Sequence, residues 1–592
     1  MKLRKSLLAS LHIVWRVSPI YTLGILLITI FQGFAPIIGL HLTKLMLDRV
    51  ASLFAGASQE VIQALLYLII IQALFGLVSS IFNLLRMNIE TLFSSRVENK
   101  IILDILRKAH SLPINHFEDS EFYDRLENAY AEAGTRPLEM MSGALDLLQS
   151  GITLVSFVGI VWTLNPWALT AVIIAMLPSF WVQTRFGNLN YWMMKWRAPE
   201  ARKQAYLGNI LHDDVLVKEM RLFNLVGHFL TMHQQLYGQF FQQTSNLLKK
   251  QGWYQVLAGI LSGGGTLIAM IFLLRITLNG EVSVGEFTFY AGAIAQLGGY
   301  LAGTVSSLSN LYSNSLFMTN LFDFLAIAEP PKGGLMEWEE LLEVVTFDNV
   351  SFKYPNAEKP CLNNVSFSIE RGKTLAVVGP NGAGKTTLIK LLVGLYQPTE
   401  GRILFNGQDI SLYTPDSIFQ QISAVFQDFG RYQFTAKDNV ALGRVERSAE
   451  DGFNDATRRA RADTVIAGLP KGADTQLGKL FEQGVELSGG QWQKIALSRS
   501  YFRKAGLLIL DEPTAALDAE SEIEVFKNVR DNMLNCITVL ISHRFSSVRS
   551  ADAIVVLDKG SIVAEGTHHS LMQASEYYRT NFNMQAQGYL AA

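Results

Sequence analysis

The chain has 592 residues, of which 49% are apolar and 17% are charged, and its formal net charge is −2. A composition this apolar, with a mean hydropathy of +0.21, excludes a mostly disordered or fibrous chain. The near-zero net charge gives no general nucleic-acid-binding surface, so no nucleic-acid partner is expected. The cysteines are Cys361 and Cys536, which excludes a disulfide scaffold and disfavours a cysteine-rich metal site.

Long apolar runs occupy the N-terminal half of the chain. A run of about 20 apolar residues is long enough to cross a bilayer as a helix. We therefore predict a membrane domain over residues 1–330 with six spanning helices, near 19–42, 61–85, 140–164, 167–186, 254–278 and 287–312. The last range is rich in glycine and serine, and it is retained because small residues favour close helix packing in membranes.

Lysine and arginine are concentrated in alternate loops, with seven in 86–137 and nine in 185–250. Because such loops face the cytoplasm, the N-terminus and everything after the sixth span are predicted to be cytoplasmic. Both basic loops are long, and we expect them to extend the spanning helices as helical hairpins. Short crosswise helices are predicted at the hairpin tips, near 115–128 and 212–223.

Some ionisable residues lie at the ends of predicted spans, namely His41, Lys44 and Asp146. Two interpretations stay open for them. They either mark a pathway through the membrane or lie in helix extensions outside the hydrocarbon, and the second is preferred. Tryptophans in the same half, such as Trp162 and Trp181, are explained equally well by a cavity or by the membrane interface.

From about residue 340 the pattern changes to short strands alternating with helices, which predicts an α/β domain over 340–583. Strands are expected at 344–352, 362–369 and 374–378. The third leads into Gly-Pro-Asn-Gly-Ala-Gly-Lys-Thr-Thr (379–387) and then a helix over 388–395. This is a P-loop in its strand–loop–helix context, in which backbone N–H groups and the helix N-terminus bind phosphates. Lys385 is expected at the β- and γ-phosphates and Thr386 at Mg²⁺.

A further buried strand, 507–510, ends in Asp511 and Glu512. Asp511 fits the acid that associates with the metal, and Glu512 fits the base that orients water on the γ-phosphate. The alternative is that these acids merely cap a turn. It is disfavoured because Leu-Ser-Gly-Gly-Gln (487–491) stands about twenty residues upstream.

These motifs, in this order, resemble the ABC transporter family, and specifically exporters that fuse a six-helix membrane domain to one nucleotide-binding domain. The resemblance implies an α-helical membrane domain plus an α/β P-loop ATPase domain that uses ATP and Mg²⁺. It implies catalytic roles for Glu512, His543 and Gln427, and metal contacts from Thr386, Gln427 and Asp511. The implied nucleotide-binding residues are Tyr354, Gly379, Asn381, Gly382, Gly384, Lys385, Thr386, Thr387, Ser488, Gly489, Gly490, Gln491, Asp511 and Asp518.

Within this resemblance, Tyr354 stacks on adenine, Gln427 senses the metal, Asp518 belongs to the D-loop and His543 contacts the γ-phosphate. The stretch Leu-Phe-Glu-Gln-Gly (480–484) departs from the Gly-Glu-Arg-Gly-like pattern that many exporters have before the serine motif. This departure concerns contacts between domains and not ATP binding.

In this family the serine motif of one nucleotide domain covers ATP held by another. One chain with every element therefore implies a homodimer with two working sites, and a heterodimer with a related chain is the alternative. Closure of the nucleotide domains has to move the membrane helices. The candidate levers are the two hairpin tips, where aromatic and acidic residues such as Phe117, Glu118, Phe122 and Tyr123 are expected to dock in a groove near Gln427. The alternative is that each of these residues lies on a solvated helix turn.

The segment 116–128 resembles the first loop of exporters for lantibiotics and related modified peptides. The leading hypothesis is therefore ATP-driven export of a modified peptide across a bacterial inner or plasma membrane by alternating access. The alternative is a multidrug or lipid exporter or flippase, with an amphipathic small molecule or a membrane lipid as cargo. A channel or sensor would require decayed ATP-site motifs, and the motifs are intact.

Overall fold

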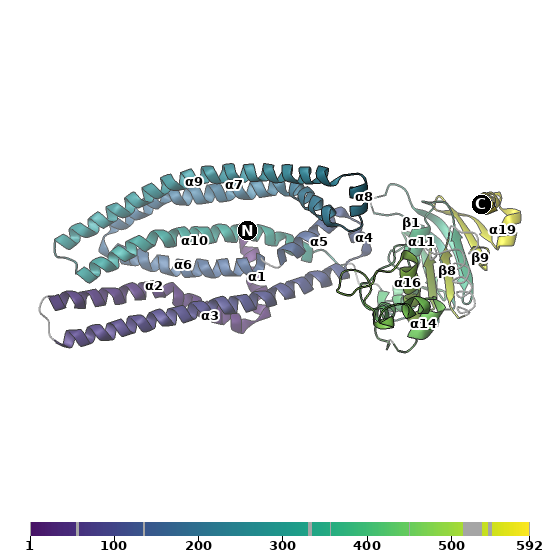
Figure 1. Cartoon of the computed structure of the whole chain (residues 1–592), viewed down its shortest axis with the longest axis horizontal. Coiled ribbons are helices and arrows are strands. Elements are labelled where there is room, and N and C mark those ends of the chain that lie inside the picture. Colours follow the sequence, from purple (N-terminus) through teal and green to yellow (C-terminus); the bar gives the residue numbers. More distant parts are fainter. Residues whose placement is uncertain are drawn as a thin grey trace. The chain divides into compact units, whose positions relative to one another are not determined.

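The computed structural model describes residues 2–54, 59–133, 136–329, 334–355, 357–448, 450–512, 535–542 and 548–590. The chain forms two compact units, a helical one made of residues 1–112 and 116–328 and a second one made of residues 113–115 and 329–592 (Figure 1). Each unit is described by itself.

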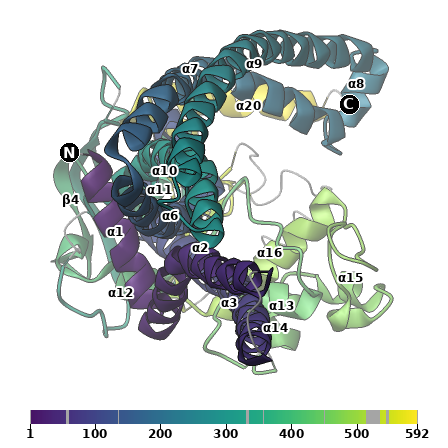
Figure 2. The ribbon, with the colours of Figure 1, turned by 90° about the vertical axis from the view of Figure 1, so that its left-hand side faces the viewer.

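The N-terminal part of the chain consists of long helices joined by short connections. They are α1 (Lys2–Val17), α2 (Pro19–Phe54), α3 (Gln59–Ser111), α4 (Ile114–Phe117), α5 (Ser120–Ala133), α6 (Arg136–Leu164), α7 (Pro166–His212), α8 (Val217–Leu222), α9 (Val226–Leu278) and α10 (Val284–Leu325). Within this unit α7 runs beside α9 and α2 beside α3 (Figure 2).

Among the described residues, five helices are long and apolar enough to cross a membrane: α2, α3, α6 over Glu139–Leu164, α7 and α9. They correspond to the first five predicted spans. The sixth predicted range forms α10, which packs against α2, α6, α7 and α9. Because α10 contains many glycines, serines and other polar residues, it is less apolar than the other five helices. That α10 crosses the membrane therefore stays a prediction.

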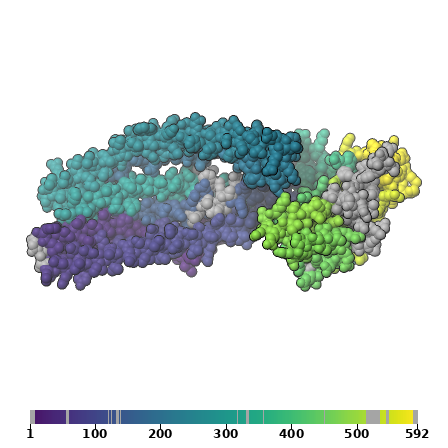
Figure 3. Space-filling model, viewed as in Figure 1, coloured from purple at the N-terminus to yellow at the C-terminus, as the bar shows by residue number. Residues whose placement is uncertain are grey.

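Large apolar side chains cover the outer surface of this unit, as expected for helices that contact lipid. On α3 they include Leu66, Tyr67 and Leu74, and on α9 they include Leu257 and Ile260. Both helices lie on the face seen in Figure 3.

The two basic loops extend the spanning helices, as predicted. The first hairpin is built by α3 and α6, with α4 and α5 at its tip, and the second by α7 and α9, with α8 at its tip. The turn between α6 and α7 follows from its sequence. Asn165 caps α7 by accepting hydrogen bonds from the N–H groups of Trp167 and Ala168, and Pro166 occupies the first helical position.

Small residues allow the closest helix contacts. A Cβ atom on Gly265 of α9 would lie 2.1 Å from Cβ of Ala175 on α7, and one on Gly292 of α10 would lie 2.6 Å from Leu40 of α2. Only glycine permits these approaches, which agrees with the role expected for small residues in α10.

The ionisable residues at the span ends have partners on neighbouring helices. Lys44 of α2 forms an ion pair with Glu286 of α10, with 3.0 Å between Nζ and Oε1. Arg86 of α3 donates to Asp146 of α6 over 2.6 Å and to Glu90 over 2.7 Å. These charges therefore join helices at the ends of the predicted spans.

The second unit contains two sheets. Its strands are β1 (Val344–Phe352), β2 (Leu362–Glu370), β3 (Thr374–Val378), β4 (Glu400–Phe405), β5 (Gln408–Asp409), β6 (Ile422–Val425), β7 (Leu507–Asp511), β8 (Ile537–Ile541), β9 (Ala553–Asp558) and β10 (Ser561–Gly566). The strand orders are β2-β1-β4-β5 and β10-β9-β3-β8-β7-β6. Strands β9, β3, β8, β7 and β6 are parallel to their neighbours in that order, which places their carboxyl ends at one edge.

The helices of this unit surround the sheets. They are α11 (Lys385–Leu392), α12 (Pro415–Gln420), α13 (Ala436–Ala441), α14 (Phe453–Arg459), α15 (Asp463–Ala467), α16 (Gly489–Arg503), α19 (His568–Ala574) and α20 (Glu576–Leu590). The four predicted strands all form, as β1, β2, β3 and β7. The helix expected over 388–395 runs instead over Lys385–Leu392, because Gly384 provides its N-cap and a left-handed Gly394 follows its end.

Candidate functional site

The loop between β3 and α11 has a backbone that depends on glycine. Gly382 and Gly384 have φ values of +79° and +103°, in the left-handed region that favours glycine. A Cβ on Gly379 would lie 2.2 Å from the carbonyl oxygen of Leu557, and one on Gly384 would lie 2.7 Å from Leu362. The loop is therefore fixed by both conformation and crowding.

Lys385, the first residue of α11, is 7% exposed and lies across this loop. Its Nζ donates to the carbonyl oxygens of Gly379, at 2.8 Å, and Pro380, at 3.0 Å. Burial lowers the pKa of this ammonium, while the charges of Glu512 and Asp511 act in the opposite direction. A buried cation that, among the described residues, bonds to carbonyl oxygens is well suited to an anionic ligand.

Two acids stand at the end of β7, close to Lys385. Asp511 is 4% exposed, and burial, followed by the charge of Glu512, raises the pKa of its carboxyl to about 6. Glu512 has a φ of +48°, and its N–H donates to the carbonyl oxygen of Ile541 over 3.0 Å. The left-handed backbone and this bond fix the Glu512 backbone at the end of β7.

Gln427, which follows β6, reaches the same acid. Its Nε2 donates to Oε2 of Glu512 over 3.2 Å. The sheet explains this meeting, because β6 and β7 are parallel neighbours and the residues that follow them lie at one edge.

The loop, the lysine and the acids enclose a cavity of about 460 Å³. Nine predicted residues line it: Asn381, Gly382, Gly384, Lys385, Thr386, Thr387, Gln427, Asp511 and Glu512. Gly379 does not line the cavity, but its carbonyl oxygen accepts a hydrogen bond from Lys385, which does. Cys361 and Ile541 also line the cavity and were not predicted.

Tyr354 does not line the cavity, but it contacts Thr387, which does. Its hydroxyl lies 3.2 Å from Oγ1 of Thr387, and Sγ of Cys361 lies 3.2 Å from the same oxygen. The Tyr354 ring also contacts the rings of Phe352 and Tyr396. This contact places an aromatic ring next to the P-loop helix.

The described residues contain no cluster of three or more His, Cys, Asp or Glu that could hold a metal by themselves. The cavity instead offers the Thr386 hydroxyl, the Gln427 amide and the Asp511 carboxylate. Mg²⁺ in nucleotide sites uses one or two protein oxygens together with phosphates and waters, so this donor set fits Mg²⁺ bound with a nucleotide.

The serine motif forms the N-terminus of α16. The side chain of Ser488 accepts from the N–H of Gln491 over 3.3 Å, and the side chain of Gln491 accepts from the N–H of Ser488 over 2.8 Å. This is a capping box. Of the described residues that line the P-loop cavity, none comes from Ser488, Gly489, Gly490 or Gln491.

Two predicted site residues, Asp518 and His543, lie outside the described residues. At the first hairpin tip, the expectation for Phe122 is wrong. Phe122 is 3% exposed and packs on Phe117 and on Phe324 of α10, so it belongs to the helical core. Phe117 and Tyr123 are 45% and 60% exposed.

Comparison with known proteins agrees with this geometry. Residues 362–515 match the family model described as ABC transporter. The subtilin transport ATP-binding protein SpaT of Bacillus subtilis is 32% identical over 93% of this chain and 89% of its own. The nisin transport ATP-binding protein NisT of Lactococcus lactis is 27% identical over 96% and 94%. An ATP-dependent lipid A-core flippase of Albidiferax ferrireducens is 29% identical over 82% and 83%.

A solved structure described as a bacterial Atm1-family ABC exporter with ATP bound shares the fold, with a TM-score of 0.76 and 24% identity over 95% of this chain and 97% of that one. The likeness extends over both units. The chain therefore belongs to the ABC transporter family, as an integral membrane exporter whose second unit is the ATP-hydrolysing domain that drives transport.

Proposed function

We propose that this protein is a homodimeric exporter that uses Mg²⁺ and ATP to move a modified peptide out of the cytoplasm. The observation that carries the peptide assignment is the alignment with the subtilin and nisin transport proteins over at least 89% of each chain. The lipid A-core flippase aligns over a smaller share, so a lipid cargo is the second candidate.

The ATP site works as follows in this proposal. Lys385 exchanges its bonds to the loop carbonyls for the β- and γ-phosphate oxygens, which carry the opposite charge. Thr386, Asp511 and Gln427 hold Mg²⁺, which supplies positive charge against the phosphates. Gly379, Asn381, Gly382, Gly384 and Thr387 shape the phosphate cradle, and Tyr354 stacks on the adenine.

Hydrolysis is assigned to Glu512, which takes the proton of the attacking water while Gln427 holds its carboxylate. His543 and Asp518 are proposed to complete the site at the γ-phosphate and between the two domains. The domain limits proposed are 1–330 for the membrane domain and 340–583 for the ATPase domain, with the N-terminus and the ATPase domain in the cytoplasm.

The homodimer is proposed because the serine motif does not line the cavity of its own chain. In the first turn of α16 the capping box uses the N–H groups of Ser488 and Gln491, and the N–H groups of Gly489 and Gly490 together with the positive dipole suit a γ-phosphate held by a second copy. Each dimer would then contain two sites, each built from the P-loop of one copy and Ser488–Gln491 of the other.

Mixed dimers test this arrangement. Two tagged chains, one with Lys385→Ala and one with Ser488→Arg, are coexpressed and purified as the mixed species. Shared sites predict one intact site and measurable ATPase activity, because both defects fall in the same site. Placing both changes in one chain, paired with an unchanged chain, damages both sites. Equal ATPase activity in the two mixed dimers would contradict shared sites.

The cargo is tested by ATPase activity of the purified protein in lipid nanodiscs. The panel contains nisin, subtilin, lipid A and hydrophobic drugs. We expect saturable stimulation by the peptides. Stimulation by lipid A or by drugs, with both peptides inert, would move the assignment to the second candidate.

A further inference from the structure

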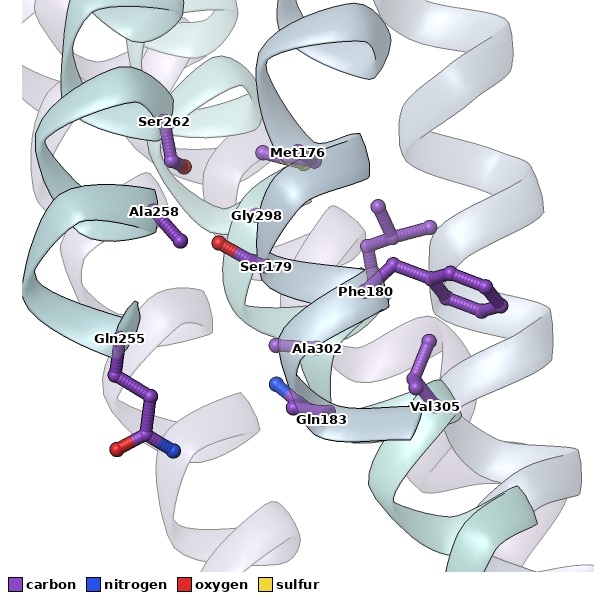
Figure 4. A pocket seen from close by; sticks show the side chains of 11 residues that line it. Met176, Ser179, Phe180, Gln183, Gln255, Ala258, Ser262, Gly298, Ala302 and Val305 are labelled. Atoms are coloured by element: carbon purple, nitrogen blue, oxygen red, sulfur yellow. The ribbon is translucent and has the colours of Figure 1, made fainter. Parts of the chain in front are cut away.

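A buried polar side chain without a full set of hydrogen bonds is costly, so each such group needs an explanation. The helical unit has a cavity of about 270 Å³ between α7, α9 and α10, but its polar side chains, Ser179, Gln183, Gln255 and Ser262, are half-buried or exposed (Figure 4). Gln493 of α16 is different. It is 2% exposed, and among the described residues its Oε1 has no hydrogen-bond partner.

The other end of the Gln493 carboxamide contacts the proposed catalytic base. Its Nε2 donates to the main-chain carbonyl oxygen of Glu512 over 3.4 Å. The N–H of Glu512 donates to the carbonyl oxygen of Ile541 over 3.0 Å, and its carboxylate accepts from Gln427 over 3.2 Å. Glu512 is therefore held by α16, by β8 and by the residue that follows β6.

Glu512 needs this support because its backbone is strained. Its φ of +48° lies in the left-handed region, which residues with a side chain adopt only where their surroundings fix them. Pro513 follows in the sequence, and a residue before proline prefers an extended backbone. Without the bond from Gln493, the backbone of Glu512 would be freer to relax towards that extended form, which would turn its carboxylate away from the γ-phosphate.

Helix α16 is itself fixed against the sheet that carries Glu512. Trp492 packs in one apolar cluster with Leu510 of β7. The hydroxyl of Ser423 on β6 donates to the carbonyl oxygen of Ser500 over 3.0 Å. Because α16 is anchored to both strands, the position of its Gln493 side chain relative to the end of β7 is well determined.

Gln493 also lies on the helix face of the serine motif. Gly489 and Gly490 precede it by four and three residues, which places them one turn away on the same face. Their N–H groups are those proposed to contact a γ-phosphate of the second copy. One helix would then serve two sites, with its first turn at the nucleotide of one site and Gln493 at the base of the other.

We propose that Gln493 is a positioning residue that holds the Glu512 of its own chain in the orientation needed for hydrolysis. This inference rests on the proposed homodimer and on the proposed role of Glu512 as the base. The bond from Nε2 is long at 3.4 Å, and hydrogen bonds around catalytic groups often tighten only in the reacting complex.

The first test separates positioning from a structural role. Gln493→Met keeps the length of the side chain and removes both polar atoms, including the unpartnered Oε1, so the Tm should change little. We expect kcat for ATP to fall about five- to thirtyfold, with KM changed less than about twofold, because the phosphate contacts proposed for Lys385 and the P-loop remain. An unchanged kcat, or a loss that appears in KM instead, would overturn the proposal.

The matched control is Ser498→Ala on the same helix. Ser498 is buried, and its hydroxyl donates to the carbonyl oxygen of Lys494 within α16 over 2.8 Å. This variant measures the effect of removing a buried polar group that does not contact Glu512, and its kcat should stay close to that of the wild type. An equal loss of kcat in Ser498→Ala and Gln493→Met would show that only the packing of α16 matters.

A second variant, Gln493→Glu, tests the hydrogen-bond donor through pH. A glutamate at this position donates to the carbonyl oxygen of Glu512 only when it is protonated, and burial favours the protonated form. The ratio of its kcat to that of the wild type should therefore rise as the pH falls from about 8 to about 6. The same ratio for Gln493→Met should stay flat. A flat ratio for both variants would contradict positioning through this bond.

Mixed dimers assign the role to a site. A Lys385→Ala chain paired with a Ser488→Arg chain keeps one intact site, which takes its P-loop and Glu512 from the Ser488→Arg chain. Adding Gln493→Met to that chain should lower kcat about five- to thirtyfold, and adding it to the Lys385→Ala chain should not. The reverse pattern would show that Gln493 supports the serine motif and not the base. If the mixed dimers instead contradict shared sites, the kcat of the Gln493→Met homodimer still decides whether Gln493 positions Glu512.

Discussion

Gln427 donates a hydrogen bond from Nε2 to Oε2 of Glu512 over 3.2 Å. The two residues are 85 positions apart in sequence, and parallel β6 and β7 bring them to the same edge of the sheet. The bond couples the residue that follows β6 to the proposed catalytic base. A change at Gln427 therefore alters the direction of the Glu512 carboxylate before any ligand binds.

The change Glu512→Gln should stop hydrolysis and keep ATP binding. The amide has the shape of the carboxylate but does not accept the proton of water, so kcat for ATP should fall by about 10²- to 10⁴-fold. ATPase assays and binding of a fluorescent ATP analogue measure the two effects. Glu400→Gln, an exposed acid on β4, is the control. Hydrolysis at the normal rate in Glu512→Gln would remove this residue from the catalytic role.

Alkylation of Cys361 should report on the ATP site. Its Sγ lies 3.2 Å from Oγ1 of Thr387 and it lines the P-loop cavity, whereas Cys536 is buried. N-ethylmaleimide should therefore inactivate ATP hydrolysis, and bound ATP should slow the inactivation at least severalfold. The variant Cys361→Ser should keep its own activity after the same treatment. Inactivation that ATP does not slow would place the nucleotide elsewhere.

Acidic pH should weaken Mg²⁺-dependent ATP binding through Asp511. Burial and the charge of Glu512 raise the pKa of this carboxyl to about 6 from its ordinary value of 3.8. Because the folded apo protein holds this proton more tightly than the unfolded chain, the group adds stability as pH falls from about 6 towards 4 and loses it as pH rises. Mg²⁺ competes with the same proton, so its apparent affinity should fall up to tenfold per pH unit below 6.

Thermal unfolding of the apo and Mg²⁺-ATP forms between pH 5 and 8 checks this expectation. The stabilisation by Mg²⁺-ATP should shrink below pH 6. The variant Asp511→Asn has no carboxyl to titrate and should lose most of that pH dependence. An identical pH profile in wild type and Asp511→Asn would show that Asp511 does not control metal binding.

The buried Arg86 cluster should stabilise the helical unit. Arg86 is 8% exposed and donates to Glu90, Asp146 and Gln32, which joins α3 to α6 and α2. Arg86→Ala leaves Glu90 and Asp146 without their cation, and because these side chains are 22% and 53% exposed, the loss should be about 1–3 kcal/mol. A lowered Tm in nanodiscs measures the loss.

Two comparisons make the Arg86 result specific. The exposed change Arg107→Ala should leave the Tm nearly unchanged, because surface ion pairs contribute about 0–1 kcal/mol. Combining Arg86→Met with Glu90→Gln and Asp146→Asn should recover much of the Tm lost in Arg86→Ala, since no unpaired charge remains. A Tm for Arg86→Ala equal to that of Arg107→Ala would show that the cluster contributes little.

The strands and the P-loop were predictable because local sequence determines them. The alternating residues of β1 and the apolar run of β3 are followed by Lys353 and Gly379, and the observed strand limits, Val344–Phe352 and Thr374–Val378, agree with the predicted ones. The start of α11 was placed three residues late, because the periodic apolar pattern begins at Leu388 while the helix begins at Lys385. The P-loop motif alone does not specify that Gly384 is the N-cap residue of α11.

The features that sequence did not reveal depend on how helices are rotated in the bundle. In the sequence, Arg86 is one of the basic residues that indicate a cytoplasmic loop. Glu90, four residues later, also indicates an ion pair on one face of a helix, and the structure contains this pair. Its bond to Asp146 requires the packing of α3 against α6, which periodicity does not specify. The cavity between α7, α9 and α10 was missed for the same reason. Cys361 gave no signal, because its approach to Thr387 is set by tertiary structure.

Transport into proteoliposomes tests the central claim most directly. The protein is reconstituted with its ATPase domains outward, and uptake of labelled nisin is followed with ATP, without ATP, and with Glu512→Gln in place of the wild type. We predict saturable nisin accumulation that needs ATP and is lost in Glu512→Gln. Equal accumulation in all three reactions, or ATP-dependent movement of lipid with no movement of peptide, would contradict the account.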